Sequence, residues 1–206
     1  MDDGGIRWRS SRPEIDGSWS RDPRARGAAS ASTHRLLETD EGTVDWTCLL
    51  PSARAELLLP DGGIARGLGY AERLELTIRP WRLPIEELRW GRFLCPEASL
   101  AWIEWRGPAP LSLALLDGRP ARLASVDADS VVLSEPAARL DLAPGTVLRE
   151  GLLGGSVLGR VPALRRSLPG RMLRVHETRW LARGALDLGS GARHEGDVVH
   201  EVVRWP

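Results

Sequence analysis

Residues 70–78 read Tyr-Ala-Glu-Arg-Leu-Glu-Leu-Thr-Ile, and this alternation of apolar and polar residues decides the fold class. Successive side chains of a β-strand point to opposite faces, so residues at every second position share a face. The even positions are apolar apart from Glu72, whereas the odd positions are mostly polar. The stretch therefore predicts a strand whose inward face carries Tyr70, Leu74, Leu76 and Ile78, together with the carboxyl of Glu72.

The same alternation occurs at residues 43–50, which read Thr-Val-Asp-Trp-Thr-Cys-Leu-Leu. Here Val44, Trp46 and Cys48 share the apolar face, so Trp46 and Glu72 are both predicted to face the interior. A carboxyl on an apolar face loses hydration, which raises its pKa, and a protonated acid beside an apolar cavity can act as a general acid. The alternative is that Glu72 forms a structural ion pair with an arginine such as Arg92.

Many short runs of this kind follow one another, separated by turns rich in Gly, Pro and Asp, such as Asp117-Gly118. This punctuation is typical of an all-β fold, an antiparallel sandwich or barrel. The expected strands are His34–Thr39, Thr43–Leu50, Ala53–Leu59, Gly69–Ile78, Ser99–Trp105, Leu111–Leu116, Ala121–Val126, Ser130–Ser134, Met172–Glu177, Arg179–Leu188 and Asp197–Trp205. Short helices are expected near residues 83–88 and 162–167.

The first 32 residues are rich in Arg, Ser, Asp, Gly and Pro, and they show little periodicity. We interpret residues 1–32 as a mostly flexible lead-in that Trp8 and Trp19 could pin to the body. Residues 33–206 are then expected to form one β domain, a size that can bury a substantial core.

Composition excludes several classes of function. The 206 residues carry 28 basic and 28 acidic side chains, so the surplus positive charge of a nucleic-acid binder is missing. All the basic residues are Arg, which excludes Schiff-base chemistry and a P-loop lysine. Two cysteines form no disulfide framework, and the four histidines show no metal-ligand spacing, so neither a metal nor a cofactor is predicted. Without a signal peptide or an apolar span, a cytoplasmic protein is expected, with peripheral contact to the inner membrane left open.

Tryptophan is unusually abundant: the chain has nine Trp, one Tyr and one Phe. Such an excess suggests a large apolar interior, a site lined by indoles, or both. The segments around Trp81 and Trp90 also contain arginines, and Trp faces can stabilise a cation. A structural ladder of stacked Trp and Arg side chains is the alternative for these segments.

Three motifs together resemble the hydroxyneurosporene synthase family, also called carotenoid 1,2-hydratases. They are Trp46-x-x-x-x-Pro51-Ser52-Ala53-Arg54-x-Glu56, then Gly67-x-Gly69-Tyr70-x-Glu72, then Leu88-Arg89-Trp90-Gly91-Arg92. Trp180-Leu181-Ala182-Arg183 and His200-Glu201 resemble the closing motifs of that family more weakly. The resemblance covers roughly residues 40–205.

The resemblance implies a lipocalin-like antiparallel barrel and cofactor-free addition of water to a double bond of an apolar isoprenoid, such as an acyclic carotenoid. Glu72 would be the proton donor, and Tyr70 would orient it or position water. Trp46 and Trp90 would form an aromatic wall, and Arg92 would tune Glu72.

The sequence departs from the family pattern at three places. Val44 stands where the family has His, Glu72 stands where it has Asp, and an apolar residue near Leu74 replaces an Asn. A binder of apolar small molecules without catalysis is therefore the alternative, because Val44 makes the pocket more apolar. A third interpretation is a β-sandwich that binds a partner protein through its Trp and Arg residues.

Overall fold

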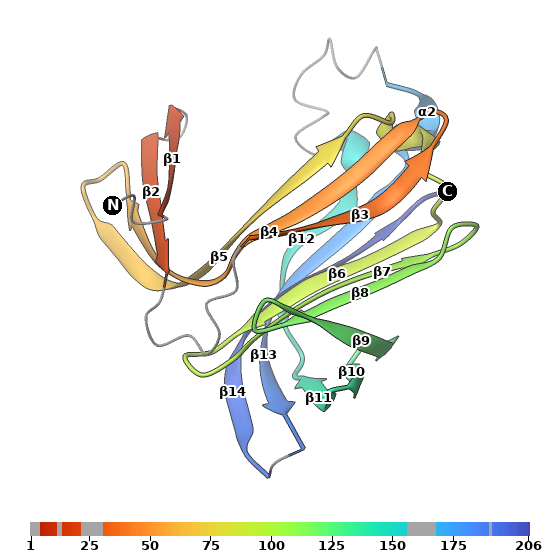
Figure 1. Ribbon diagram of the computed structural model, residues 1–206. Coiled ribbons are helices and arrows are strands. Elements are labelled where there is room, and N and C mark those ends of the chain that lie inside the picture. Colours follow the sequence, from red (N-terminus) through yellow and green to blue (C-terminus); the bar gives the residue numbers. More distant parts are fainter. Residues whose placement is uncertain (1–4, 12–13, 22–30, 156–167, 190) are drawn as a thin grey trace.

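The computed structural model describes residues 5–11, 14–21, 31–155, 168–189 and 191–206, and their strands form two antiparallel sheets (Figure 1). The first sheet is a curled sheet of five strands, and the second closes into a barrel. The chain is therefore all-β with a lipocalin-like antiparallel barrel, as the alternation of its residues predicts.

The first sheet is built around one long strand. Its members are β1 (Ile6–Ser11), β2 (Glu14–Arg21), β3 (Ser32–Thr39), β4 (Gly42–Leu58) and β5 (Ile64–Leu76). Along one edge, β4 pairs first with β3 and then with β2, while β5 pairs with its other edge. Register shifts between Cys48 and Ala53 interrupt the β4–β5 ladder, and Pro51 lacks a backbone N–H for it. Such bulges bend a strand, which explains the curl of this sheet.

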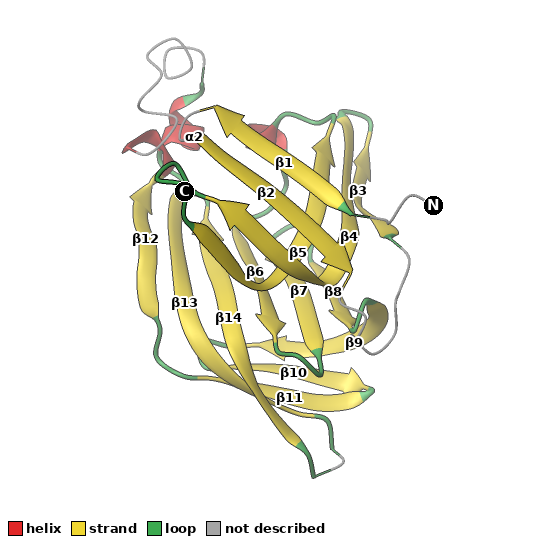
Figure 2. Ribbon diagram, turned by 90° about the vertical axis from the view of Figure 1, so that its left-hand side faces the viewer, coloured by secondary structure: helices red, strands yellow, loops and turns green. Residues whose placement is uncertain are grey.

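The second sheet contains the remaining nine strands. They are β6 (Glu87–Leu94), β7 (Ser99–Arg106), β8 (Leu111–Leu116), β9 (Arg119–Val126), β10 (Ser130–Glu135), β11 (Ala137–Leu142), β12 (Thr146–Leu152), β13 (His176–Asp187) and β14 (Arg193–Arg204). The end of β13 pairs with β11 and closes a barrel of eight strands, whereas β12 pairs with the first half of β13 outside the barrel (Figure 2). Asp117 and Gly118 form the tight β8–β9 turn with positive φ angles of 51° and 74°.

Alternation along β7 separates two apolar layers. Leu100 and Trp102 pack inside the barrel with residues of the opposite wall such as Leu140. Ile103 and Trp105 face outward and pack against Trp46 and its neighbours on the first sheet. The outer wall of the barrel and the inner face of β3–β5 therefore form a second core, and the candidate site lies there.

The helix expectations are only partly testable and partly wrong. No helix forms at residues 83–88, where Pro84 precedes an extended segment and β6 begins at Glu87. A 3-10 turn at Pro80–Arg82 and the short α2 (Gly170–Leu173) occur instead. The helix expected near residues 162–167 falls outside the described residues. The strand expected at residues 172–177 is wrong as well, since it spans the end of α2 and the start of β13.

The lead-in expected at residues 1–32 contains two strands. β1 and β2 form a hairpin, and Asp16–Arg21 of β2 pair with Ala53–Leu58 of β4. The physical reason is that β3 pairs only with the first half of β4. Beyond the bend, the backbone N–H and C=O groups on that side of β4 need another partner, and β2 provides it. Trp19 packs against Gly69 of β5, so it does pin this hairpin to the sheet.

The helices in the described part of the chain lack the length and the apolar character needed to cross a bilayer.

Candidate functional site

Five of the six site residues predicted from the sequence line one groove. Val44 and Trp46 come from β4, Glu72 from β5, and Trp90 and Arg92 from β6. The groove has a volume of about 440 Å³ and lies between the first sheet and the outer wall of the barrel. This is within the size range of small-molecule sites, and most of the lining is apolar.

One oxygen of the Glu72 carboxyl is held at the wall of the groove by two neutral donors, Trp46 and Tyr70. The indole Nε1 of the buried Trp46 donates a hydrogen bond to Oε2 of Glu72 at 2.5 Å. The hydroxyl of Tyr70 donates to the same oxygen, so Tyr70 touches the site although it does not line the groove. Because Tyr70 and Glu72 are two residues apart on β5, they share a face, as the alternation predicts.

Burial of the Glu72 carboxyl raises its pKa, since the charged form loses hydration. The hydrogen bond from Trp46, the positive charge of Arg92 and a hydrogen bond from Trp90 act in the opposite direction, while the charge of Glu201 adds to the increase. The residue as a whole is exposed because β5 is an edge strand, but the carboxyl itself lies among these groups. Glu72 is therefore a carboxylic acid with a raised pKa at the wall of an apolar groove.

Arg92 acts on Glu72 through its charge and not through a close ion pair. Among the described residues, no carboxylate oxygen lies within 4.0 Å of its guanidinium. Instead, the guanidinium carbon lies 4.8 Å from the centre of the Tyr70 ring and 5.5 Å from that of Trp90. Burial lowers the pKa of Arg92 and the charge of Glu72 raises it. Among the described residues, Glu72 thus forms no close ion pair with Arg92, the partner that the alternative names.

Glu201 and Arg179 also line the groove, and sequence reasoning did not assign them to it. They face each other across β13 and β14, where the Arg179 Nε lies 2.7 Å from Oε2 of Glu201. Burial raises the pKa of Glu201, while the charge of Arg179 lowers it. The alternation of β14 puts Glu201 on the same face as Val199, which also lines the groove. This shared face is the sequence signal that could have indicated Glu201. Unlike the carboxyl of Glu72, the carboxyl of Glu201 already forms a close ion pair with the guanidinium of Arg179.

Two further tryptophans belong to the groove, Trp105 of β7 and Trp205 beyond the end of β14. The indole nitrogen of Trp205 is buried without a hydrogen-bond partner among the described residues. Trp180, by contrast, stacks on His200 at 5.0 Å and does not line the groove. Four indoles therefore surround the cavity, which accounts for part of the Trp excess.

Val44 is almost completely buried, with 1% of its surface exposed, at the position where the resembled family has a histidine. An imidazole is nevertheless close, because His34 of β3 lies opposite Trp46 in the β3–β4 ladder. Their ring centres are 5.9 Å apart, and the His34 Nε2 is 3.1 Å from the Ser32 hydroxyl. Burial lowers the pKa of His34, which favours the neutral ring beside Trp46.

The inward face predicted for β5 is less buried than expected. Leu74 and Leu76 line the groove, yet 54% and 36% of their surfaces are exposed. The reason is that β5 is the edge of the first sheet, so its apolar face meets an open groove instead of a closed core. An apolar rim of this kind can receive an apolar ligand.

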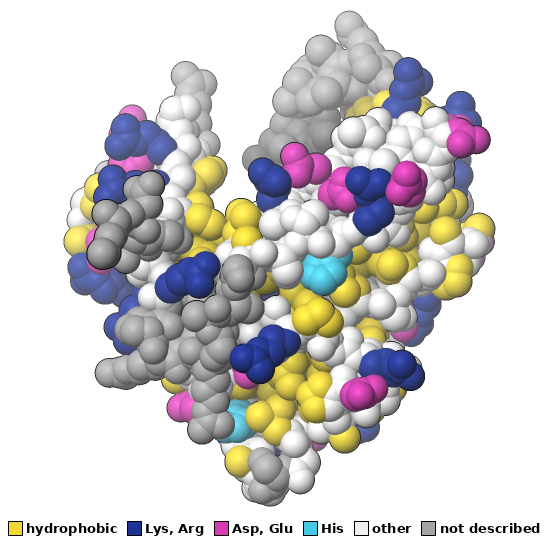
Figure 3. Space-filling view, in the orientation of Figure 1, with side chains coloured by type: hydrophobic (Ala, Val, Ile, Leu, Met, Phe, Trp, Pro, Cys, Tyr) yellow, Lys and Arg dark blue, Asp and Glu magenta, His cyan; other side chains and the backbone are white. Residues whose placement is uncertain are grey.

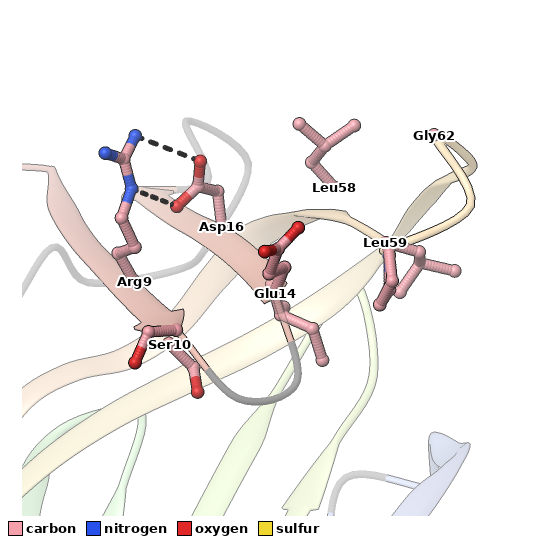
Figure 4. Close-up of a pocket in the computed structure, with 10 residues that line it drawn as sticks. Arg9, Ser10, Glu14, Asp16, Leu58, Leu59 and Gly62 are labelled. Atoms are coloured by element: carbon pink, nitrogen blue, oxygen red, sulfur yellow. Dashed lines mark hydrogen bonds and ion pairs between the residues drawn. The ribbon is translucent and has the colours of Figure 1, made fainter.

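A second pocket lies at the far end of the first sheet and offers weaker chemistry (Figure 4). It is bounded by the β1–β2 hairpin and the end of β4, and its main polar feature is the ion pair between Arg9 and Asp16. The side chain of Arg9 is 81% exposed, so water screens this pair. Figure 3 shows apolar side chains at the base of the hollow between this hairpin and the rest of the molecule. The Trp-lined groove remains the better candidate because burial raises the pKa of its two carboxyls, Glu72 and Glu201.

The stability of the protein should depend on pH through Glu72. A carboxyl with a raised pKa binds more protons in the folded state than in the unfolded state, so stability falls as pH rises from the ordinary Glu value through the raised one. We expect Glu72→Gln to gain stability over the wild type as pH rises through this window, measured by urea unfolding at several pH values.

Glu75→Gln is the matched control, because Glu75 lies on the same strand but outside the groove. A difference between Glu72→Gln and wild type that stays constant with pH, or that reverses, would contradict the assignment of a buried carboxyl. Glu201→Gln tests whether the second acid contributes with the same sign.

Comparison of the sequence with protein-family models finds no match, and comparison with curated proteins finds none either. The assignment of the groove therefore rests on the residues and geometry described above.

Proposed function

We propose that this chain is a hydratase-like lyase of the hydroxyneurosporene synthase type, which adds water to a double bond of an apolar isoprenoid such as an acyclic carotenoid. One observation carries the proposal: the Glu72 carboxyl, its pKa raised by burial, is held by Trp46 and Tyr70 at the wall of an apolar groove lined by indoles. The proposed reaction needs no cofactor, and the proposed location is the cytoplasm, in peripheral contact with the inner membrane.

The reaction balances with the residues of the groove. The protonated carboxyl of Glu72 gives its proton to the less substituted carbon of a terminal alkene, and the alkene π electrons form the new C–H bond. A tertiary carbocation and the Glu72 carboxylate result. Water attacks the cation through its lone pair, and the resulting oxonium returns a proton to the carboxylate, which restores the acid.

The neighbours of Glu72 suit this cycle. Indole faces attract cations, so Trp90 and Trp46 can stabilise the carbocation. The positive charge of Arg92 stabilises the carboxylate that proton transfer creates, which makes Glu72 a stronger acid than burial alone would allow. Tyr70 and Trp46 donate to one oxygen and thereby orient the carboxyl.

The alternative proposal is a lipocalin-like binder that holds an apolar small molecule without transforming it. The burial of Val44 favours it, because the groove beside Trp46 then presents a methyl surface where the family has an imidazole. Binding would still use the apolar lining and the rim formed by Leu74 and Leu76.

Two measurements on the purified chain separate these proposals. We expect acyclic carotenoids in detergent to quench Trp fluorescence saturably, because four indoles surround the groove. We also expect mass spectrometry to find a product heavier by one water. Saturable quenching without that product would establish the binder, and the absence of both signals with any apolar polyene would overturn both proposals.

A further inference from the structure

The tight turn between β6 and β7 presents a cysteine and a carboxylate away from the groove. It runs Cys95-Pro96-Glu97-Ala98 at the end of β6 opposite the C-terminus (Figure 1). The Cys95 N–H donates to the Ala98 carbonyl at 3.0 Å, and the Ala98 N–H donates to Sγ of Cys95 at 3.2 Å. The turn therefore fixes the sulfur in place through its own backbone.

The start of β14 brings a third donor to this turn. β14 pairs with β6 as far as Asp197 and Leu94, and His194 lies three residues before that pair. The Cys95 sulfur, a Glu97 carboxylate oxygen and a His194 ring nitrogen all lie within 4.8 Å of one another. In the part of the chain that the structure describes, no hydrogen bond or ion pair occupies the His194 ring, so its nitrogen is available.

We propose that Cys95, Glu97 and His194 bind a divalent zinc-type cation. Sulfur, imidazole nitrogen and carboxylate oxygen are the three donor types that zinc prefers, with bonds of about 2.0–2.3 Å. A tetrahedral centre with such bonds holds its ligand atoms about 3.5 Å apart. The donor atoms now lie within 4.8 Å of one another, and the exposed Glu97 and the half-buried His194 have room to rotate closer together. A water molecule completes the fourth position.

The bound cation itself makes Cys95 a thiolate ligand, because the surroundings of this thiol raise its pKa. Burial raises the pKa of the Cys95 thiol, backbone N–H groups of Glu97 and Ala98 that hydrogen-bond to the sulfur lower it, and the side-chain hydrogen bond and charge of Glu97 raise it again, so that the net shift is upward. On binding, the thiol gives its proton to solvent and its lone pair to the metal, with no change in oxidation state. The cation also neutralises the Glu97 charge that otherwise opposes ionisation.

Cys48 provides a matched comparison within the same chain. It is also buried and reduced, and burial raises the pKa of its thiol to about 12. Its neighbour across the β4–β5 ladder is Glu72, and it packs in the apolar core beside the groove. It belongs to no group of three donors among the described residues.

Cobalt(II) titration of the reduced, chelator-treated full chain tests the proposal. We expect one equivalent to produce thiolate-to-cobalt charge-transfer absorption together with the intense visible bands of a tetrahedral centre, and zinc to abolish both by displacement. Cys95→Ala should lose the charge-transfer band, and Cys48→Ala should retain it. We expect His194→Ala to weaken binding by at least the roughly 10–100-fold that loss of an outer-shell partner costs, whereas His176→Ala should leave it unchanged.

The proposal is overturned if the wild type shows no charge-transfer band, or if the band survives in Cys95→Ala. Circular dichroism shows whether Cys95→Ala is folded. If it is not, the surface variant Glu97→Ala and His194→Ala decide, and unchanged cobalt affinity in both overturns the site. At the same zinc concentration, the melting temperature of the wild type should also rise by more than that of His194→Ala, because stabilisation by a ligand grows with its affinity for the folded state.

Discussion

Glu72→Gln is expected to lower the rate of water addition by about 10²–10⁴-fold, the usual contribution of a general acid. Glutamine keeps the shape of the side chain and an oxygen that can accept the hydrogen bond from Trp46, but its amide protons are not acidic enough to be transferred to an alkene. The loss should therefore appear in kcat, while the apolar ligand still quenches Trp fluorescence with similar affinity. Mass-spectrometric quantification of the hydrated product over time measures the rate.

Two variants separate the role of Glu72 from a general disturbance of the groove. Tyr70→Phe removes one donor to the carboxyl and should cause a smaller loss, with the pH profile of the rate displaced, because Tyr70 acts on the substrate through Glu72. Glu201→Gln removes the other acid, which Arg179 already holds, and should leave more activity than Glu72→Gln. Equal rates in wild type and Glu72→Gln would refute the proposed acid, and an inactive Glu201→Gln beside an active Glu72→Gln would assign the role to Glu201.

Local alternation of apolar and polar residues is sufficient to predict the strands that line the groove from the first sheet, but not the strands whose formation depends on distant partners. The patterns at residues 43–50 and 70–78 predict that Trp46 and Glu72 both face the interior. β4 and β5 pair with Trp46 opposite Leu74 and Glu72 opposite Cys48, so both side chains lie on one face of the first sheet. The β1–β2 hairpin was missed because its stability depends on the second half of β4, more than thirty residues away. No strand is predicted over β6, in part because a short helix is expected at residues 83–88, whereas Pro84 and the pairing of Glu87 and Leu88 with β7 keep this segment extended.

The candidate site shows the same division between local and distant information. Alternation along one strand indicates which side chains share a face, so it places Val44 with Trp46. Trp90 and Arg92 are expected in the site only from the family resemblance, because no strand is predicted over the residues of β6. The ion pair of Arg179 with Glu201 depends on the β13–β14 register, which no local pattern sets.

The proposed cation site could not be predicted from the spacing of ligand residues in the sequence. His194 lies about a hundred residues from Cys95, and only the β14–β6 ladder brings the two together.

Trp102→Ala is expected to reduce the free energy of unfolding by about 3–5 kcal/mol, the cost of removing a buried aromatic side chain and leaving a cavity. Trp102 is 2% exposed and fills the barrel interior so closely that a Cβ on Gly91 would lie 2.2 Å from its ring. This cost is a large share of the roughly 5–15 kcal/mol that stabilises a typical domain. Urea unfolding followed by circular dichroism measures the change.

Trp90→Ala is the informative partner, because Trp90 is half-buried and faces the groove instead of the barrel interior. It should lose less than half as much stability as Trp102→Ala and yet lose most of the polyene-induced quenching. If Trp102→Ala does not fold, Gly91→Ala disturbs the same contact by overpacking, with an expected loss of about 1–3 kcal/mol. Polyene binding should survive in Gly91→Ala, since the disturbed contact lies inside the barrel. The contrary outcome is that Gly91→Ala and Trp90→Ala both lose polyene binding in proportion to their loss of stability. Trp90 and Trp102 would then belong to one core, and the distinction between a structural barrel interior and a ligand groove on its outer wall would be wrong.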